Sequence, residues 1–405
     1  MQISSSHLTS DFCKTFFFLL IITFSQCFRP AISCAQVIVG AERMDQYVDS
    51  LKGKKIALVV NQTSLVGKKH LADTLLDLGI QIKKIFAPEH GFRGDADAGE
   101  NITGAVDSKT NIPIVSIYGQ KLKPTTEDLA GIDLVIYDIQ DVGVRFYTYV
   151  STLHYVVEAC AENNIPLLVL DRPDPNGYYV DGPVLRPEFS SFVGMDPVPV
   201  VYGMTPAEYA QMLTGEQWLA TKKVCAFSYV LCEGYDHSTF YTLPVNPSPN
   251  LRSMNAIHLY PSICFFEGTP VSVGRGTDRP FSMIGYPGFT KGNAEFNPKS
   301  LPGAKNPPYL NQTCKGFDLT GLNTGYFKEN PRLMLHWLSD FYTSYPEKDK
   351  FFTSFFDKLA GTDQLRKQIE KGTPEMEIRR SWEPALSEFK VLRKKYLLYR
   401  DFEGQ

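Results

Sequence analysis

The chain has 405 residues, of which 43% are apolar and 21% are charged, a composition typical of a globular protein with material for two domains. This composition excludes a disordered chain. The formal net charge is only −3, which excludes the strongly basic character of nucleic-acid-binding proteins, and we expect no nucleic-acid partner.

The first residues of the chain are typical of a secretion signal. Lys14 precedes the apolar run Phe16–Ile22, which is too short to cross a membrane comfortably. The small residues Ser33–Ala35 match a cleavage site, so we expect residues 1–35 to be removed. The mature protein would then be periplasmic or secreted, without a membrane span. Lipid attachment at Cys34 is an alternative, although the residues before it form a poor lipobox, and an uncleaved anchor is a third.

Apolar runs and helical patterns alternate after the signal. Residues 70–78 and 150–160 have the apolar spacing of helices. The runs with strand character are Lys55–Val60, Ile82–Phe86, Ile114–Tyr118, Leu134–Tyr137 and Leu167–Leu170. Apolar strands separated by helices predict an α/β domain over residues 36–222, with a parallel sheet covered on both faces.

The pattern changes after about Trp218. Proline and glycine become frequent, the strand signals are short, and helical patterns return only around 331–342 and 354–371. These features predict a second, smaller α+β domain over residues 223–405.

Metal, redox and nucleotide chemistry find little support in the sequence. Beyond the signal the cysteines are odd in number and lack a C-x-x-C pair, which argues against a zinc site and a disulfide framework; they are Cys160, Cys225, Cys232, Cys264 and Cys314. A single bridge, such as Cys225 with Cys232, stays open. Gly274 and Gly276 lack the third glycine of a dinucleotide fingerprint, and the sequence has no P-loop, H-E-x-x-H or G-x-S-x-G motif. We expect no metal and no cofactor.

Polar residues follow every predicted strand of the first domain. The carboxyl ends of parallel strands share one edge of a sheet, where ligands bind, so we expect these residues to meet there. They are Asn61 and Gln62, Glu89 and His90, Tyr118, Asp138 and Asp141, and Asp171 and Arg172.

Glu89 is the leading candidate for catalysis. Pro88 stiffens the chain before it, and the glycines at 91 and 94 permit tight backbone geometry. Phe86 and Phe92 provide apolar neighbours, and an apolar wall favours a general acid near neutral pH. A salt bridge from Glu89 to Arg93 is the structural alternative. For the neighbouring His90, a substrate contact and a hydrogen-bonded structural role are equally open.

A second catalytic group is expected because glycosidic cleavage usually needs two carboxyl groups. Asp138 and Asp141 are the candidates, and Tyr147 is a third, because a tyrosine nucleophile is a known exception. The structural alternative for Asp141 is capping of the following helix.

Arginines recur near these acids, and a guanidinium group matches a substrate carboxylate bidentately. Substrate binding is predicted for His90, Arg93, Arg145, Asp171, Arg172, Asn246 and Arg275. For any single arginine, pairing with an acid of the protein itself is the alternative.

Four motifs of the chain resemble those of the exo-β-N-acetylmuramidase family; they are Ala87–Gly94, Asp138–Tyr149, Asp171–Gly177 and Gly274–Asp278. The resemblance covers about residues 37–402. It implies a Rossmann-like N-terminal domain without a dinucleotide, an auxiliary C-terminal domain and a cleft between the two. It also implies release of N-acetylmuramic acid from the non-reducing ends of peptidoglycan fragments, with Glu89 as the glutamate of the family's P-E-H-G motif.

We therefore expect an exo-acting glycoside hydrolase that acts on peptidoglycan-derived saccharides, with Glu89 as general acid or acid/base. An arginine, Arg275 or Arg93 first, would hold the lactyl carboxylate of muramic acid. The alternatives are an exo-glycosidase for another amino sugar and a non-catalytic muropeptide-binding protein of the envelope. The clustered acids favour catalysis, since a binding module needs no poised proton donor.

Overall fold

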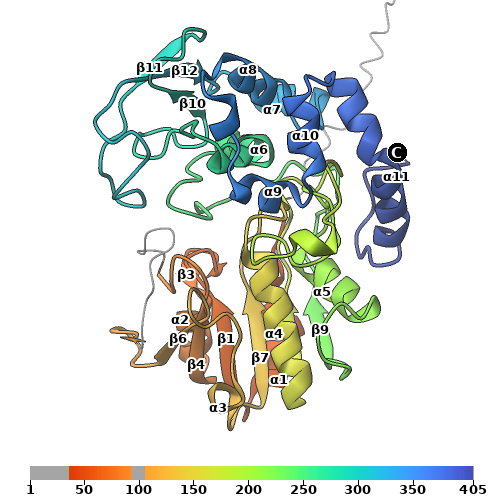
Figure 1. Cartoon of the computed structure of the whole chain (residues 1–405). Helices are drawn as coiled ribbons and strands as arrows, with labels where there is room; N and C mark the ends of the chain where they lie inside the picture. The colour runs from red at the N-terminus through yellow and green to blue at the C-terminus, as the bar shows by residue number, and fades with distance from the viewer. Residues whose placement is uncertain (1–35, 94–104, 405) are drawn as a thin grey trace, which may run out of the picture. The chain divides into compact units, whose positions relative to one another are not determined.

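The computed structural model describes residues 36–93 and 105–404, so the predictions for residues 1–35 lie outside the described part of the chain. Residues 37–405 form one compact unit. Its largest sheet has seven strands in the order β5-β6-β4-β1-β7-β8-β9, of which β6, β4, β1, β7 and β9 are labelled in Figure 1. In chain order these strands are β1 (Lys55–Val60), β4 (Gln81–Ala87), β5 (Ala105–Val106), β6 (Pro113–Ser116), β7 (Leu134–Asp138), β8 (Leu167–Leu170) and β9 (Phe227–Val230).

The strand order of this sheet is that of a doubly wound fold. All neighbours pair in parallel except β5, which runs antiparallel to β6 at the edge. The six parallel strands, numbered along the chain, lie in the order 3-2-1-4-5-6, so the order reverses between β1 and β7. The predicted α/β class and Rossmann-like architecture are therefore confirmed.

Each face of the sheet packs against its own hydrophobic cluster. In β1, Ala57 and Val59 belong to one cluster, whereas Ile56, Leu58 and Val60 belong to the other. This two-residue alternation is that of a strand with helices or loops on both faces. The helices of this half of the chain are α1 (Val48–Leu51), α2 (Leu71–Asp77), α3 (Thr126–Leu129), α4 (Tyr149–Asn163) and α5 (Pro206–Gly215). A short hairpin, β2 (Leu65–Val66) with β3 (Lys69–His70), follows β1.

The second half of the chain combines a small antiparallel sheet with helices. Its strands pair in the order β10-β12-β11 and are β10 (Met283–Tyr286), β11 (Ala294–Phe296) and β12 (Cys314–Asp318). Its helices are α6 (Met254–Ile263), α7 (Thr324–Glu329), α8 (His336–Ser344), α9 (Ser354–Ala360), α10 (Gln364–Glu370) and α11 (Glu375–Arg393). The predicted α+β character of this region is confirmed.

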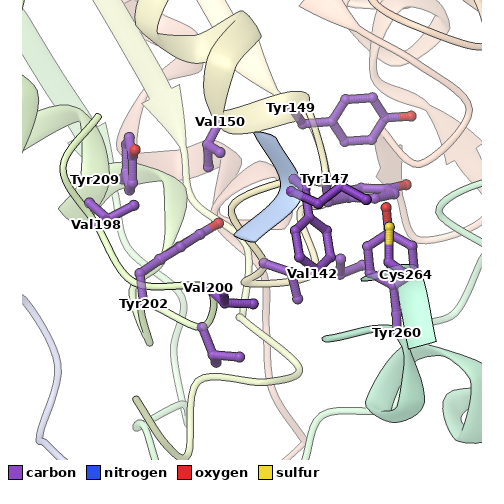
Figure 2. Packing of buried hydrophobic residues seen from close by; sticks show 14 of the residues in the cluster. Val142, Tyr147, Tyr149, Val150, Val198, Val200, Tyr202, Tyr209, Tyr260 and Cys264 are labelled. Atoms are coloured by element: carbon purple, nitrogen blue, oxygen red, sulfur yellow. The ribbon is translucent and has the colours of Figure 1, made fainter. Parts of the chain in front are cut away.

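One hydrophobic cluster continues from the sheet domain into the second half of the chain. Tyr147 packs edge-on against Tyr149, with ring centroids 4.8 Å apart, and against Tyr260 of α6 at 5.7 Å. Figure 2 shows these rings together with Cys264, on the other side of the cluster from Tyr209. The two halves therefore share a core.

Several boundaries differ from the predictions. Strand β9 starts five residues after the predicted domain boundary at 222/223, yet it pairs with β8 and extends the first sheet. The predicted helix 354–371 is two helices, α9 and α10, because Gly361 takes a left-handed φ of 71° that ends α9. All five cysteines beyond the signal are free and buried, and Cys225 contacts Cys160 rather than forming a bridge to Cys232.

Candidate active site

The ends of β4 and β6 bring Glu89 and Tyr118 together. Ala87 pairs with Ser116 at the end of this ladder, and the amide of Ile117 donates to the carbonyl of Ala87 at 2.9 Å. Glu89 and Tyr118 each lie two residues beyond these partners. Side chains two residues apart share a face of a strand, so the register carries both residues to the same place.

A tight turn presents Glu89. The amide of Gly91 donates to the carbonyl of Pro88 at 3.0 Å, and His90 and Gly91 both have positive φ, 68° and 77°. Positive φ is uncommon for a residue with a side chain, so His90 holds a strained conformation of the kind found at functional sites. His90 is buried, whereas Glu89 stays partly exposed.

Two hydroxyl groups contact the Glu89 carboxyl group. The Oγ1 of Thr148 donates to Oε2 of Glu89 at 3.0 Å, and the phenol of Tyr118 forms a second hydrogen bond to the same side chain. Burial, together with the nearby charge of Glu89, raises the pKa of Tyr118 well above its usual value, so this phenol stays protonated and donates. Glu89 is thus an acceptor for two fixed donors.

Glu89, Tyr118 and Thr148 line a cavity of about 200 Å³ to which both halves of the chain contribute. From the second half come Tyr260, Glu267, Arg275 and Phe281, with Phe355 and Leu359 of α9. Of the described residues that line the cavity, only Glu89 and Glu267 carry a carboxylate, and only Arg275 carries a permanent positive charge.

The guanidinium group of Arg275 is held in place on the cavity wall. Its Nε donates to Oε1 of Glu267 at 2.7 Å, and its central carbon lies 5.0 Å from the ring centroid of Phe281. The side chains of Arg275 and Glu267 are about one-quarter exposed, 22% and 25%. Because only Nε is used for the pair, the two terminal nitrogens of Arg275 remain able to donate to a ligand.

Comparisons with known proteins identify this architecture. The model of the N-terminal domain of the exo-β-N-acetylmuramidase NamZ matches residues 56–255, and the model of its C-terminal domain matches residues 258–399. The chain belongs to this exo-β-N-acetylmuramidase family. The match between residues 56 and 255 includes β9, in agreement with the pairing of that strand in the first sheet.

The alignments with known relatives cover nearly the whole length of this chain. The peptidoglycan β-N-acetylmuramidase NamZ of Bacillus subtilis is 38% identical over 371 residues, which are 88% of this chain and 89% of that protein. Two crystal structures of DUF1343 family proteins from Bacteroides fragilis superpose with TM-scores of 0.84 and 0.76, at 47% and 26% identity. Each comparison covers 90% of this chain and 99% of the other.

The structure separates the three candidates for the second catalytic group. Asp138 is fully buried and paired with Arg172, whose Nε and terminal nitrogen donate to its two oxygens at 2.5 and 3.0 Å. Asp141 is also buried; it accepts from Tyr202 and from an amide at 2.7 Å. Neither is among the residues that line the cavity. Tyr147 lines the cavity, but its hydroxyl donates to the carbonyl of Pro247 at 2.8 Å.

Most of the predicted substrate-binding residues also lie away from the cavity wall. Arg93 forms a two-nitrogen pair with Asp107, with a shortest distance of 3.0 Å, and Arg145 donates to three main-chain carbonyls of the protein interior. Asp171 is buried and accepts from the Tyr399 hydroxyl at 2.6 Å. The side chain of Asn246 is exposed. Of the predicted binding residues, those on the cavity wall are His90 and Arg275.

Tyr118, Thr148 and Glu267 line the cavity but were not among the residues predicted as catalytic or substrate-binding. Tyr118 carried a usable signal, since it follows a predicted strand as Glu89 does. Thr148 lies within the Asp138–Tyr149 motif but has no titratable group, and Glu267 follows a buried helix with no motif around it.

In the described residues, 36–93 and 105–404, no group of three or more His, Cys, Asp or Glu side chains is arranged to hold a metal ion. Over the same residues, no helix is both long enough and apolar enough to cross a membrane.

Proposed function

We propose that this protein is an exo-acting β-N-acetylmuramidase that releases N-acetylmuramic acid from the non-reducing ends of peptidoglycan fragments, with Glu89 as general acid/base. The family, and the printed activity of the Bacillus subtilis relative at 38% identity, support the substrate class. The position of Glu89 on the wall of a cavity shared by the two halves of the chain supports its role.

The small size of the cavity supports the proposal that the enzyme acts at the end of a glycan chain. Its volume of about 200 Å³ is below the roughly 300–1,000 Å³ of pockets that enclose larger ligands. Such a space suits a single terminal sugar rather than a continuous stretch of glycan. Phe192, Tyr260 and Phe281 contribute aromatic surface to the same wall, on which the apolar face of a sugar ring can pack.

Arg275 is proposed to bind the lactyl carboxylate that distinguishes muramic acid from glucosamine. It is the permanent cation of the cavity lining in the described residues. Its pairing with Glu267 and its contact with Phe281 fix the guanidinium plane, so less side-chain freedom is lost when a carboxylate binds.

The proposed site of action is the periplasm or the outside of the cell. The signal-like segment before Gln36 supports this localisation, with cleavage after Ala35 and without lipid on Cys34. Mass spectrometry of the native protein tests it: an N-terminus at Gln36 supports cleavage, and a lipidated Cys34 contradicts it.

A direct assay tests the activity. We expect purified protein incubated with the disaccharide MurNAc-GlcNAc to release free N-acetylmuramic acid, and longer glycans to lose one residue at a time from the non-reducing end. The Glu89→Gln variant is the matched control, since it keeps the shape of the side chain. Absence of product, or cleavage inside longer glycans, would contradict the proposal.

A further inference from the structure

The segments that hold the Glu89 carboxyl group come from two separate strand ends. Tyr118 follows β6, which pairs directly with β4, the strand that ends two residues before Glu89. Thr148 lies at the start of α4, after β7. The Thr148 hydroxyl is 3.0 Å from Oε2 of Glu89, and the Tyr118 phenol bonds to the same carboxyl group. Contacts from two directions restrict rotation of the carboxyl group more than either contact alone.

Thr148 occupies a position at which its hydroxyl normally serves the helix. It is the N-cap residue of α4, where a threonine side chain usually accepts a hydrogen bond from the first turn. Here its side chain makes no capping hydrogen bond and its hydroxyl donates to Glu89. Helix stability alone does not explain this orientation.

The ring of Tyr118 is fixed by an aromatic series that leads away from Glu89. Its centroid lies 5.9 Å from that of Phe192, and Phe192 stacks on Tyr155 at 6.4 Å with an interplanar angle of 14°. The ring that carries the Tyr118 hydroxyl is therefore supported by neighbouring aromatic side chains. Tyr155 belongs to the same series but does not line the cavity.

We propose that Tyr118 and Thr148 are positioning residues that act on the reaction through Glu89, by holding its carboxyl group in the orientation needed for proton transfer. This inference rests on the proposed role of Glu89. A proton-transfer group must be placed within hydrogen-bond reach of the reacting oxygen, and small displacements are costly for the rate.

The test removes each hydroxyl without changing the bulk of the side chain. For Tyr118→Phe and Thr148→Val we expect kcat on MurNAc-GlcNAc to fall about ten- to hundredfold, the effect of one hydrogen bond to a charged group, with little change in KM. Thr148→Ser keeps the hydroxyl and should recover most of kcat. Tyr155→Phe, the matched control from the same aromatic series, should keep the wild-type rate.

Rescue by a conservative variant separates positioning of Glu89 from a general loss of structure. Thr148→Ser keeps a hydroxyl that can donate to Glu89 and Thr148→Val does not, so only Thr148→Ser should keep a kcat near that of the wild type, while both variants keep its melting temperature. A Tyr118→Phe variant with the kcat of Tyr155→Phe would overturn the inference. Should Tyr118→Phe fail to fold, Thr148→Val and Thr148→Ser decide by the same measurements.

Two further controls separate this inference from the proposed function. A wild-type protein without activity on the disaccharide, or a fully active Glu89→Gln variant, contradicts the proposed function itself. If Glu89→Gln is inactive while Tyr118→Phe and Thr148→Val are both fully active, the proposed function stands and the positioning role of the two hydroxyl groups is rejected.

Discussion

Two stretches of the same sheet edge both carry acidic side chains, but one stretch faces a cavity and the other is buried. Beyond β4 and β6, Glu89 and Tyr118 face a cavity. At and just beyond the ends of β7 and β8, Asp138, Asp141 and Asp171 are buried in the protein interior with exposures of 0–2%. The strands of both stretches run parallel, so strand direction alone does not separate the two environments.

The difference arises from the chain that covers each stretch. At the ends of β7 and β8, the side chains of Arg172, Tyr202 and Tyr399 donate hydrogen bonds to the three aspartates. At β4 and β6 the covering residues leave about 200 Å³ open. A carboxylate at a strand end is therefore a candidate for chemistry only where later segments leave it accessible.

The largest effect should come from the open stretch. Glu89→Gln removes the proposed proton donor, and general acid–base catalysis contributes about a hundred- to ten-thousand-fold. We expect kcat to fall by that factor while the melting temperature barely moves, because Glu89 is partly exposed. Steady-state kinetics and thermal melts on one preparation test both parts, and a stable, fully active variant would contradict them.

The buried stretch should respond in the opposite way. Asp138→Asn leaves the charge of Arg172 buried without its partner, and breaking one side of a buried pair costs about 3–5 kcal/mol. The free energy of unfolding, measured in urea, should fall by that amount, while folded enzyme keeps its kcat. Asp49→Asn is the control: Asp49 pairs with Lys52 on the exposed surface, so its loss should leave the free energy of unfolding unchanged. Loss of kcat in folded Asp138→Asn would point to a catalytic Asp138.

A smaller effect is expected at the cation of the cavity. Arg275→Met should narrow the kcat/KM preference for muramides over glucosaminides by about ten- to hundredfold, the worth of one charge-assisted hydrogen bond. Arg279→Met is the matched control, because Arg279 directly follows the same motif but is not among the residues that line the cavity. Its guanidinium group pairs with Asp318 at 2.6 Å. An unchanged preference in Arg275→Met would remove this arginine from substrate recognition.

The last and smallest expected effect is a gradual change of the free energy of unfolding with pH, caused by Asp141 in the buried stretch. Burial raises the pKa of Asp141 from its ordinary 3.8 to about 7. Between these values the folded state binds more protons than the unfolded state, so stability falls as pH rises, by at most about 1.4 kcal/mol per pH unit. Asp141→Asn removes this contribution. The wild-type minus variant unfolding free energy should therefore decrease between pH 4.5 and 7.5, and parallel curves would contradict the assignment.

The strands and helices of the sheet domain could be predicted closely, because the apolar patterns that indicate them lie within short segments of the sequence. The strand predicted over Lys55–Val60 has the observed bounds, and the helix pattern at 150–160 lies within α4. The helix α11, whose inward face carries Ile378, Trp382 and Leu386, was not predicted although its apolar spacing is helical. Strand β9 was missed because only one of its four residues is buried, which weakens the apolar signal.

The site was predictable only in part. Glu89 could be found because a strand end and a rigid turn adjoin it in sequence. The burial of Asp138 and Asp171 could not be predicted from the sequence, because their hydrogen-bond partners lie 34 and 228 residues away along the chain. The cavity contribution of Glu267 was hidden for the same reason, since only packing of the two halves brings it near Glu89.

The distance from Asp171 to its partner near the C-terminus has a consequence for biosynthesis. The hydroxyl of Tyr399 bonds to Asp171, and the amide of Leu398 donates to Glu208 of α5 at 2.8 Å. During translation, the sheet and its helices are made long before these last residues exist. Until residues 398 and 399 have left the ribosome, two acids of the sheet domain therefore lack these donors, so their hydrogen bonds form late in folding.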